Sequence, residues 1–229
     1  MEGKMGKVEV QTQVSFNELY NLYIECGTTP PEWLARMLGR SVRKQLTDEE
    51  LRRAAIDSGI PFMFSVAETD TRMIELLSSG LGLYILGVQG AGKTWMACRI
   101  AKGWLSEGMG SVRFVSSVRL LTEINDTYDN RGYSENQVLN QYSKYQLLIV
   151  DDLGKEVPSK WALSRLFTIF DTRYANAMPT IVTTQFSTSA LAKRMAESGD
   201  TETAMAIVSR FKEKYKLLDM GSHDRRAEK

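Results

Sequence analysis

The residues best suited to chemistry lie in three stretches of the chain, and the first is the segment 87–94. It reads Gly-Val-Gln-Gly-Ala-Gly-Lys-Thr and fits the phosphate-binding pattern G-x-x-x-x-G-K-[ST] at every specified position. Glycine lets the backbone take conformations that a Cβ forbids, so successive N–H groups can point at one anion. An ordinary glycine-rich turn rarely carries the Lys-Thr pair at this spacing after an apolar stretch such as 81–86. The sequence therefore predicts a nucleotide phosphate site here.

Each residue of this segment has an expected part in binding a nucleotide. Lys93 would reach the β- and γ-phosphates, and the hydroxyl of Thr94 would join the shell of a Mg²⁺ ion. A helix expected from Lys93 onward would add the unpaired N–H groups of its first turn. The predicted nucleotide-binding residues are Gly87, Val88, Gln89, Gly90, Ala91, Gly92, Lys93 and Thr94.

The second stretch is an acidic pair that follows four apolar residues, 147–150. Such a run is typical of a strand buried on both faces in a parallel sheet, and ligands bind at the carboxyl ends of such strands. This is the placement of a Walker B motif. Asp151 would hold Mg²⁺, directly or through water, and Asp152 would orient and activate the attacking water. An apolar run ending in Asp-Asp is by itself a common transition from strand to loop, and the upstream phosphate-binding segment favours the functional interpretation.

The third stretch is the buried strand expected at 180–185, which ends in polar side chains. If this strand lies between the other two, Thr184 or Gln185 can approach the γ-phosphate and the water. The alternative for Gln185 is a simple turn at the end of a strand.

A sheet and helices must position these motifs, and the hydrophobic pattern predicts both. Strands are expected at 81–86, 112–115, 147–150, 180–185 and 215–220. Helices are expected at 15–24, 32–38, 47–55, 66–77, 190–195 and 203–211, and from Lys93, Ser117, Ser134 and Ser159 onward. We expect Trp95 and Trp104 to pack inside the protein rather than to stack on a base.

Residues 1–60 are expected to form a small helical appendage that docks on a partner, and residues 61–229 an ATPase domain. The basic residues between 36 and 53 could contact nucleic acid, but acidic neighbours favour a solvated face. The 29 Lys and Arg residues against 28 Asp and Glu residues give a net charge of +1, which argues against a general electrostatic grip on nucleic acid. Two cysteines and one histidine are too few for a disulfide framework or a zinc site. We expect a cytoplasmic protein without a membrane segment.

Together, these motifs resemble the DnaC/DnaI/IstB branch of AAA+ ATPases. The resemblance covers about residues 51–226, and the Leu-Gly after the acidic pair is its most discriminating part. Further support comes from Ser58-Gly-Ile-Pro61, from Arg173-Tyr174 and from Ser209-Arg210. The resemblance implies an α/β P-loop fold of the AAA+ type, with a five-stranded parallel sheet flanked by helices.

What the resemblance implies about function is more specific. It implies ATP and Mg²⁺ as ligands, assembly into a ring or spiral on a partner, and an arginine finger, Arg210, that acts on a neighbouring subunit's nucleotide. The catalytic residues would be Asp152, Gln185 and Arg210, with Thr94 and Asp151 as metal ligands. The segment 117–142, with Arg119, Arg131 and Tyr133, matches the element with which relatives line a channel for single-stranded DNA.

The chain departs from the branch at three points. Gln185 stands where the branch usually has Asn, and it is the longer side chain. The C-terminal motif Gly-x-Ser/Asp-x-Arg is only partly matched by the segment 221–225, which puts Arg225 as a second sensor in doubt. The zinc ligands of DnaI-type N-terminal domains are absent from this sequence.

The favoured interpretation is an ATP-hydrolysing loader of a DnaB-like replicative helicase that acts in DNA replication and contacts single-stranded DNA weakly and in an ATP-dependent way. An IstB-like helper of a transposase shares the same ATPase residues and is the first alternative. The second alternative is an adaptor that binds ATP as a structural switch and hardly hydrolyses it.

Overall fold

The structure is a computed structural model that describes residues 15–26, 46–128, 132 and 134–224. The chain divides between Gln45 and Leu46 into two compact units. In the first, α1 (Phe16–Glu25) starts after Ser15, whose hydroxyl accepts a hydrogen bond of 3.2 Å from the Glu18 N–H. This confirms the helix expected from residue 15. The helix expected at 32–38 lies outside the described residues.

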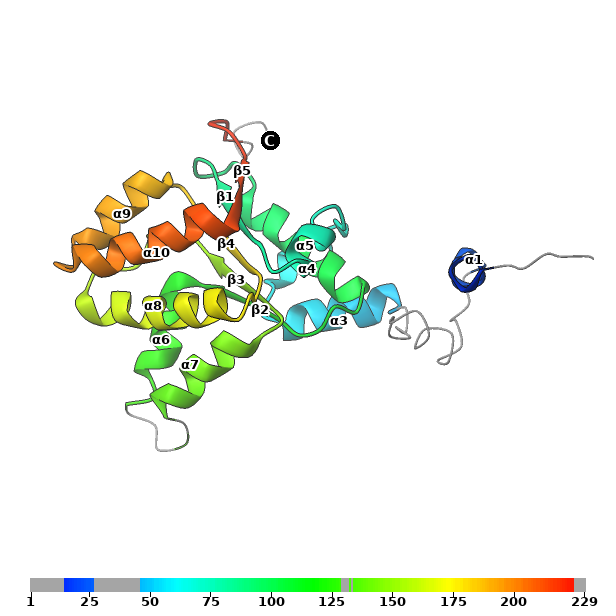
Figure 1. Cartoon of the computed structure of the whole chain (residues 1–229), viewed down its shortest axis with the longest axis horizontal. Coiled ribbons are helices and arrows are strands. Elements are labelled where there is room, and N and C mark those ends of the chain that lie inside the picture. Colours follow the sequence, from blue (N-terminus) through cyan, green and yellow to red (C-terminus); the bar gives the residue numbers. More distant parts are fainter. Residues whose placement is uncertain (1–14, 27–45, 129–131, 133, 225–229) are drawn as a thin grey trace, which may run out of the picture. The chain divides into compact units, whose positions relative to one another are not determined.

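The second unit contains a five-stranded parallel sheet (Figure 1). Its strands are β1 (Gly82–Leu86), β2 (Val112–Ser116), β3 (Leu147–Asp151), β4 (Thr180–Thr184) and β5 (Tyr215–Asp219). Their order in space is β2-β3-β4-β1-β5. β4 therefore lies between β1, which leads into the phosphate-binding segment, and β3, which ends in the acidic pair. The predicted fold class is confirmed.

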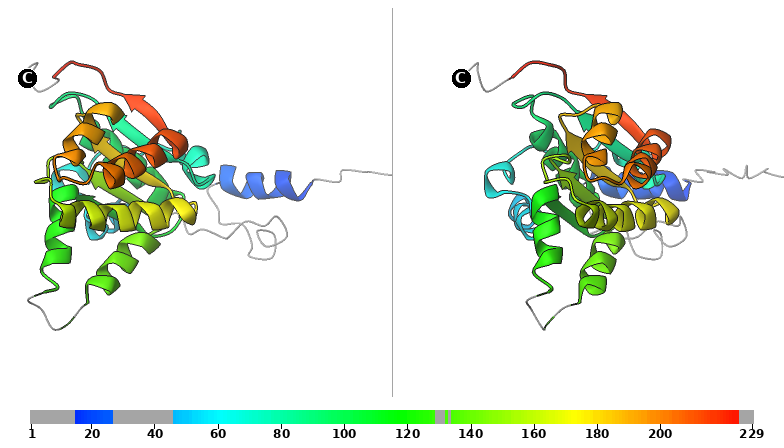
Figure 2. Two further views of the ribbon diagram at one scale, coloured as in Figure 1. Left: turned by 60° about the vertical axis from the view of Figure 1, so that its left-hand side comes forward. Right: turned by 90° about the vertical axis from the view of Figure 1, so that its left-hand side faces the viewer.

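The helices of this unit cover both faces of the sheet (Figure 2). They are α3 (Asp48–Asp57), the 3-10 helix η1 (Phe62–Phe64), α4 (Ile74–Ser78), α5 (Lys93–Ser106), α6 (Ser117–Asn125), α7 (Glu135–Lys144), α8 (Lys160–Ala175), α9 (Thr188–Ala196) and α10 (Thr201–Lys214). Because successive strand side chains point to opposite faces, each strand contributes to two cores. Val150 and Val182 pack with α6 to α10, whereas Ile149 and Ile181 pack with α3, α4 and α5.

Serine and threonine side chains start several of these helices. Ser116, Ser134 and Ser159 each accept a hydrogen bond from the helical N–H three residues on. A side-chain oxygen at this position satisfies one of the N–H groups that the first turn leaves unpaired. The helices expected from Ser134 and Ser159 are confirmed, and the cap of α6 is Ser116 rather than Ser117.

The segment 46–60 belongs with the ATPase unit, whereas we expected the appendage to extend to residue 60. α3 starts with the predicted capping box at Thr47, and Ala55 is fully buried in the core around α5. The Phe114 N–H donates to the Ser58 carbonyl at 2.7 Å. A Cβ at Gly59 would lie 2.4 Å from the Phe114 carbonyl oxygen, so only glycine allows this approach. Docking on a partner by residues 1–45 stays a prediction.

The helix expected over 66–77 is wrong for most of its length, because only Ile74–Ser78 is helical. Residues 65–70 are instead held against α5 by tertiary contacts. The ammonium of buried Lys102 donates to the carbonyls of Ser65 and Ala67 at 2.8 and 2.5 Å. Gly103 lets the Asp70 carbonyl approach, since a Cβ there would lie 2.3 Å from its oxygen.

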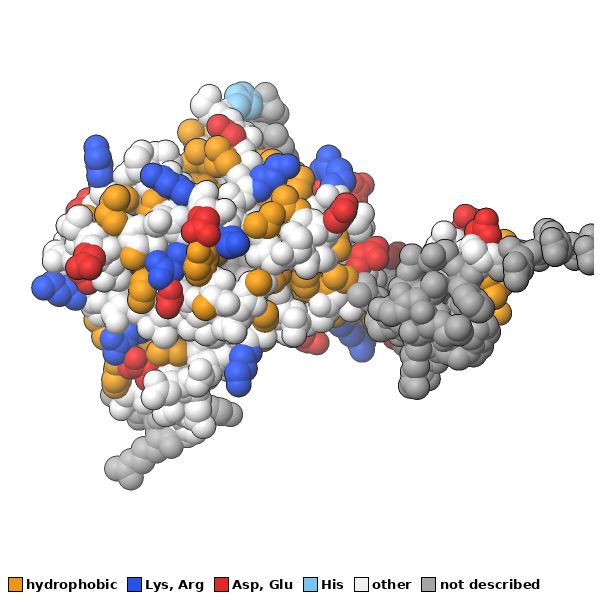
Figure 3. Space-filling view, viewed as in Figure 1, with side chains coloured by type: hydrophobic (Ala, Val, Ile, Leu, Met, Phe, Trp, Pro, Cys, Tyr) orange, Lys and Arg blue, Asp and Glu red, His pale blue; other side chains and the backbone are white. Residues whose placement is uncertain are grey.

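On the face of the molecule in Figure 3, basic and acidic side chains of the described residues are interspersed. This agrees with the net charge of +1 of the whole chain. None of the helices in the described part of the chain has the length and apolar character needed to cross a membrane.

Candidate nucleotide site

The predicted phosphate-binding segment connects β1 to the start of α5. Gly90 and Gly92 have φ angles of +80° and +92°, which L side chains rarely adopt, and α5 begins directly after Gly92. The Lys93 ammonium returns over the loop and donates to the Val88 carbonyl at 2.9 Å. The loop therefore has the curvature and the lysine position that binding a phosphate chain requires.

The C-terminal residues of the described chain lie against this loop. The Met220 N–H donates to the Leu86 carbonyl at 2.7 Å, and the Val88 N–H donates to the Gly221 carbonyl at 3.3 Å. The carboxyl group of Asp224 contacts Gly90 so closely that a Cβ would lie 1.7 Å from its Oδ1. Gly90 thus allows both the backbone conformation and this contact. Arg225 lies outside the described residues.

Asp151 is brought to the phosphate-binding loop by the parallel register of the sheet. The Thr94 hydroxyl lies 3.1 Å from both of its carboxylate oxygens, and the Thr183 hydroxyl donates to Oδ1 at 2.5 Å. Burial raises the pKa of the Asp151 carboxyl, and the hydrogen bonds from the two hydroxyls counteract this effect in part. Two oxygen-bearing side chains of the kind that Mg²⁺ prefers therefore lie side by side, and their role as metal ligands stays a prediction.

Asp152 has a left-handed backbone conformation, with φ of +56°. Its N–H donates to the Thr183 hydroxyl at 2.9 Å, so one threonine of β4 fixes both acidic residues. The Asp152 Oδ2 accepts a hydrogen bond of 2.7 Å from the Lys155 ammonium. Unlike Asp151, Asp152 lines the cavity described next.

A cavity of about 670 Å³ lies above the phosphate-binding loop, within the size range of small-molecule sites. Among the predicted residues, it is lined by Gln89, Gly90, Gly92, Lys93, Thr94, Asp152 and Gln185. The structure thus brings together residues from three separate stretches of the chain. Gln185, rather than Thr184, faces this cavity, because the Thr184 hydroxyl is fully buried and donates to the Leu153 carbonyl at 2.6 Å.

Three predicted binding residues contribute to the loop from outside the cavity lining. The N–H groups of Gly87, Val88 and Ala91 donate to the carbonyls of Thr184, Gly221 and Val88, each at 3.3 Å. These bonds hold the loop against β4 and the C-terminal segment.

Sequence reasoning missed four residues of the lining: Met63, Phe64, Trp95 and Lys155. Trp95 is 40% exposed and meets Phe64 edge to face, with 5.9 Å between the ring centres. The expectation that Trp95 packs inside the protein is therefore wrong, whereas Trp104 is buried as expected. Trp95 could have been predicted at the site, because it directly follows Thr94 in the sequence. Phe64 could not, because it reaches the site only through the contacts that hold residues 65–70 on α5.

Arg210 lies outside the lining of this cavity. From α10 its guanidinium pairs with the carboxylate of Asp171 on α8, with Nε 2.8 Å from Oδ1. It also stacks over the rings of Phe167 and Tyr174, at 4.9 and 5.4 Å from their centres. An action of Arg210 on its own chain's nucleotide is therefore disfavoured, and its action on a neighbour stays a prediction.

A family of known proteins accounts for this combination of fold and site. The sequence profile of the family described as "IstB-like ATP binding protein" matches residues 11–229. The chain belongs to this family.

Two proteins that are similar in sequence to this chain carry different names. The replicative helicase loader DnaC of Escherichia coli K12 is 31% identical over 111 residues, which are 48% of this chain and 45% of DnaC. An ATP-binding protein of insertion sequence IS1162 from Pseudomonas fluorescens is 29% identical over 126 residues, 52% of this chain and 53% of that protein. The chain thus spans about half the length of these relatives.

Among solved structures, a crystal structure of DnaI superimposes with a TM-score of 0.57 at 22% identity and covers 77% of this chain and 87% of the DnaI chain. At this identity the likeness concerns the fold.

The described residues fit the ligands that an ATP-binding family implies. The cavity offers a lysine and helix N–H groups for phosphates and an aromatic pair, Phe64 and Trp95, for a base. For Mg²⁺ there are the Thr94 hydroxyl in the lining and the Asp151 carboxylate beside it, 3.1 Å away. A Mg²⁺ ion bound there would neutralise charge on the phosphates. Asp152 and Gln185 line the same cavity as Lys93, so the arrangement can hold a water for attack on a terminal phosphate.

Proposed function

We propose that this chain is an ATP-hydrolysing loader of a replicative helicase. In this proposal it binds ATP and Mg²⁺ in the cavity above the phosphate-binding loop and assembles as a ring or spiral on a DnaB-like hexamer in the cytoplasm. Asp152 and Gln185 position the attacking water, and Arg210 serves the nucleotide of the adjacent subunit. The observation that carries the proposal is that Lys93, Thr94 and Asp152 line one cavity, with the Asp151 carboxylate 3.1 Å from the Thr94 hydroxyl, in a chain related to a helicase loader.

In this proposal the helix pair α6 and α7 contacts single-stranded DNA. Arg119 lies on α6, and its guanidinium pairs with Glu123 at 2.9 Å. Arg131 and Tyr133 lie outside the described residues. The mixed surface charge supports a weak contact with a few phosphates that gains strength from assembly.

A transposition helper is the second candidate, because the family takes its name from IstB and a relative belongs to an insertion sequence. Both candidates use the same ATPase residues and differ in the client protein. An adaptor that binds ATP as a structural switch and hardly hydrolyses it is the third candidate, and in it Asp152 would have little catalytic part.

The experiment is a pull-down with the tagged full chain and a non-hydrolysable ATP analogue. Replicative helicase and the transposase of an IS21-type element are supplied separately, each at the same concentration. We expect the helicase to be retained, and retention to be lost in Lys93→Ala. Retention of the transposase alone would contradict the loader proposal and favour the transposition helper.

A further inference from the structure

A tight turn after β3 places a lysine on the carboxylate of Asp152. The Lys155 N–H donates to the Asp152 carbonyl at 3.2 Å, and the turn uses the left-handed conformations of Asp152 and Gly154, at φ of +56° and +96°. As a result the Lys155 ammonium lies 2.7 Å from Asp152 Oδ2. This lysine is no part of the phosphate-binding pattern or of the acidic pair, and the proposed function has not used it.

The backbone of this turn is fixed by its neighbours. The Leu153 N–H donates to the Thr183 carbonyl at 2.9 Å, and the Gly154 N–H donates to the carboxylate of Glu156 at 3.0 Å. A Cβ at Gly154 would lie 2.7 Å from the Phe186 ring. Since this backbone is held, a change in the position of the ammonium must come from the flexible side chain of Lys155, which is 46% exposed.

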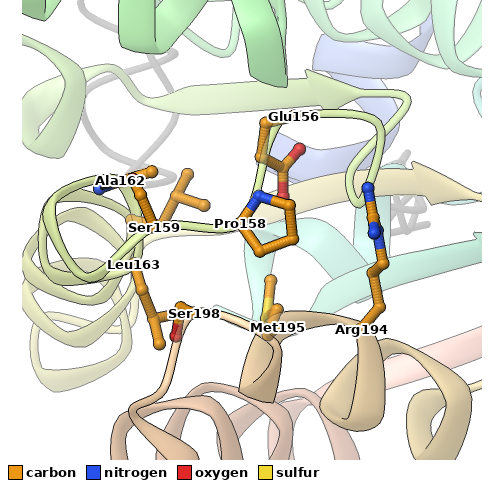
Figure 4. Close-up of a pocket in the computed structure, with 9 residues that line it drawn as sticks. Glu156, Pro158, Ser159, Ala162, Leu163, Arg194, Met195 and Ser198 are labelled. Atoms are coloured by element: carbon orange, nitrogen blue, oxygen red, sulfur yellow. Dashed lines mark hydrogen bonds between the residues drawn. The ribbon is translucent and has the colours of Figure 1, made fainter.

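The segment that follows the turn is also packed. Figure 4 shows Glu156 and Pro158 opposite Met195 and Arg194 of α9. These residues enclose a space of only about 10 Å³, too small for more than a single water. The segment after the turn is therefore closely packed against α9, whereas Lys155 of the turn lines the nucleotide cavity.

The charges in the cavity decide which partner Lys155 takes. Its pair with Asp152 is partly exposed, and such pairs contribute at most about 1 kcal/mol. A terminal phosphate carries roughly −1.5 to −2 charges, against −1 on a carboxylate, so at equal distance it attracts the ammonium up to about twice as strongly. The β-phosphate of a diphosphate would remain with Lys93 and the loop N–H groups, farther from the turn.

We propose that Lys155 senses the terminal phosphate of a nucleoside triphosphate: it pairs with Asp152 in the absence of a γ-phosphate and moves to the γ-phosphate when ATP binds. The inference rests on the proposed function, which places the γ-phosphate next to Asp152. The same movement frees Asp152 Oδ2 to accept a hydrogen bond from the attacking water. Lys155 is then a substrate-binding residue that distinguishes ATP from ADP.

The test compares the affinities of the full chain and of Lys155→Met for a non-hydrolysable ATP analogue and for ADP, both with Mg²⁺. We expect the affinity for the analogue to fall about tenfold, which corresponds to about 1.4 kcal/mol, while the affinity for ADP stays unchanged. Lys155→Arg should retain most of the preference for the triphosphate, because it keeps the charge. Lys160→Met removes an exposed lysine from the next helix and should change neither affinity.

Equal losses for both nucleotides, or no loss for the analogue, would overturn the inference while leaving the ATP site in place. Failure of the unchanged chain to bind either nucleotide would overturn the ATP site itself, and the inference with it. Melting temperatures of all variants show whether a loss of affinity reflects a loss of folding.

Discussion

The adjacent carboxylates of Asp151 and Asp152 differ in backbone conformation, and this difference places them in different surroundings. Asp151 continues the strand and is buried between the hydroxyls of Thr94 and Thr183. Asp152 takes a left-handed conformation and faces the cavity. One carboxylate therefore fits a metal ligand and the other a group that holds water, although the sequence gives them the same side chain.

Asp152→Asn tests this division at the residue scale. The change keeps the shape of the side chain and removes its charge, so we expect ATP to bind as before while hydrolysis falls by roughly 10² or more. The measurement is nucleotide affinity beside steady-state phosphate release. Asp126→Asn, at the exposed C-terminal end of α6, is the matched control and should leave both unchanged. A parallel loss of ATP binding would instead make Asp152 a metal ligand.

At the scale of elements, Glu123 of α6 connects the helix pair α6 and α7 to strand β2 of the sheet through hydrogen bonds. Its carboxylate accepts hydrogen bonds from Arg113 of β2 at 2.8 Å, from Arg119 of α6 at 2.9 Å and from the Tyr142 hydroxyl of α7. Burial would raise the pKa of Glu123, but these hydrogen bonds and the charge of Arg113 outweigh burial and lower it below 4.5. The pair is thus anchored at its base, near the sheet.

The pKa shift of Glu123 has a consequence for stability. Because the folded pKa is lowered, the stabilisation is present above the unfolded value of about 4.5 and is lost as the pH falls through the folded pKa. Glu123→Gln should lower the free energy of unfolding by about 1 to 3 kcal/mol at neutral pH. The difference between the two proteins should shrink as the pH falls below about 4.5.

Urea unfolding of both proteins across this pH range provides the measurement. Glu49→Gln removes an exposed carboxylate that pairs with Arg53, and it should have little effect at any pH. A constant difference between the wild-type and Glu123→Gln curves would show that the charge of Glu123 does not contribute through its lowered pKa.

The elements also show what the sequence could predict. Strands and capped helices were predictable because their signals are local: apolar runs for β3 and β4, and serines at the starts of α7 and α8. The segment 66–73 was mispredicted because its conformation depends on Lys102 and Gly103, more than thirty residues away. For the same reason Phe64 was missed at the site, whereas Lys93 and Asp151 were found by their spacing within short motifs.

At the scale of the whole molecule, Arg210 connects the site to assembly. Its partner Asp171 is 41% exposed, so their ion pair is weak and a phosphate on another subunit can compete for the guanidinium. An arginine finger acting between subunits typically contributes 10³ to 10⁵ in rate, or about 4 to 7 kcal/mol. A surface arginine that only pairs with Asp171 would contribute nothing to the rate.

Mixing two inactive variants distinguishes these roles. Arg210→Ala should bind ATP normally and hydrolyse it poorly, and Lys93→Ala should fail to bind ATP. In mixed assemblies the first variant supplies intact sites and the second supplies intact fingers, so part of the ATPase activity should return. If the mixture stays as inactive as its parts while light scattering confirms assembly, Arg210 does not act between subunits.

The measurement that tests the central claim most directly is ATP binding and turnover by the full chain and by Lys93→Ala, with Mg²⁺ present and removed. Lys93→Ala removes the ammonium that lies over the phosphate-binding loop, while Lys193→Ala removes an exposed lysine of α9 and serves as its control. We expect the full chain and Lys193→Ala to bind ATP and to release phosphate only with Mg²⁺, and Lys93→Ala to lose binding or hydrolysis with an unchanged melting temperature. Nucleotide affinity and turnover both unchanged in Lys93→Ala would contradict the assignment of this cavity as the site of an ATPase.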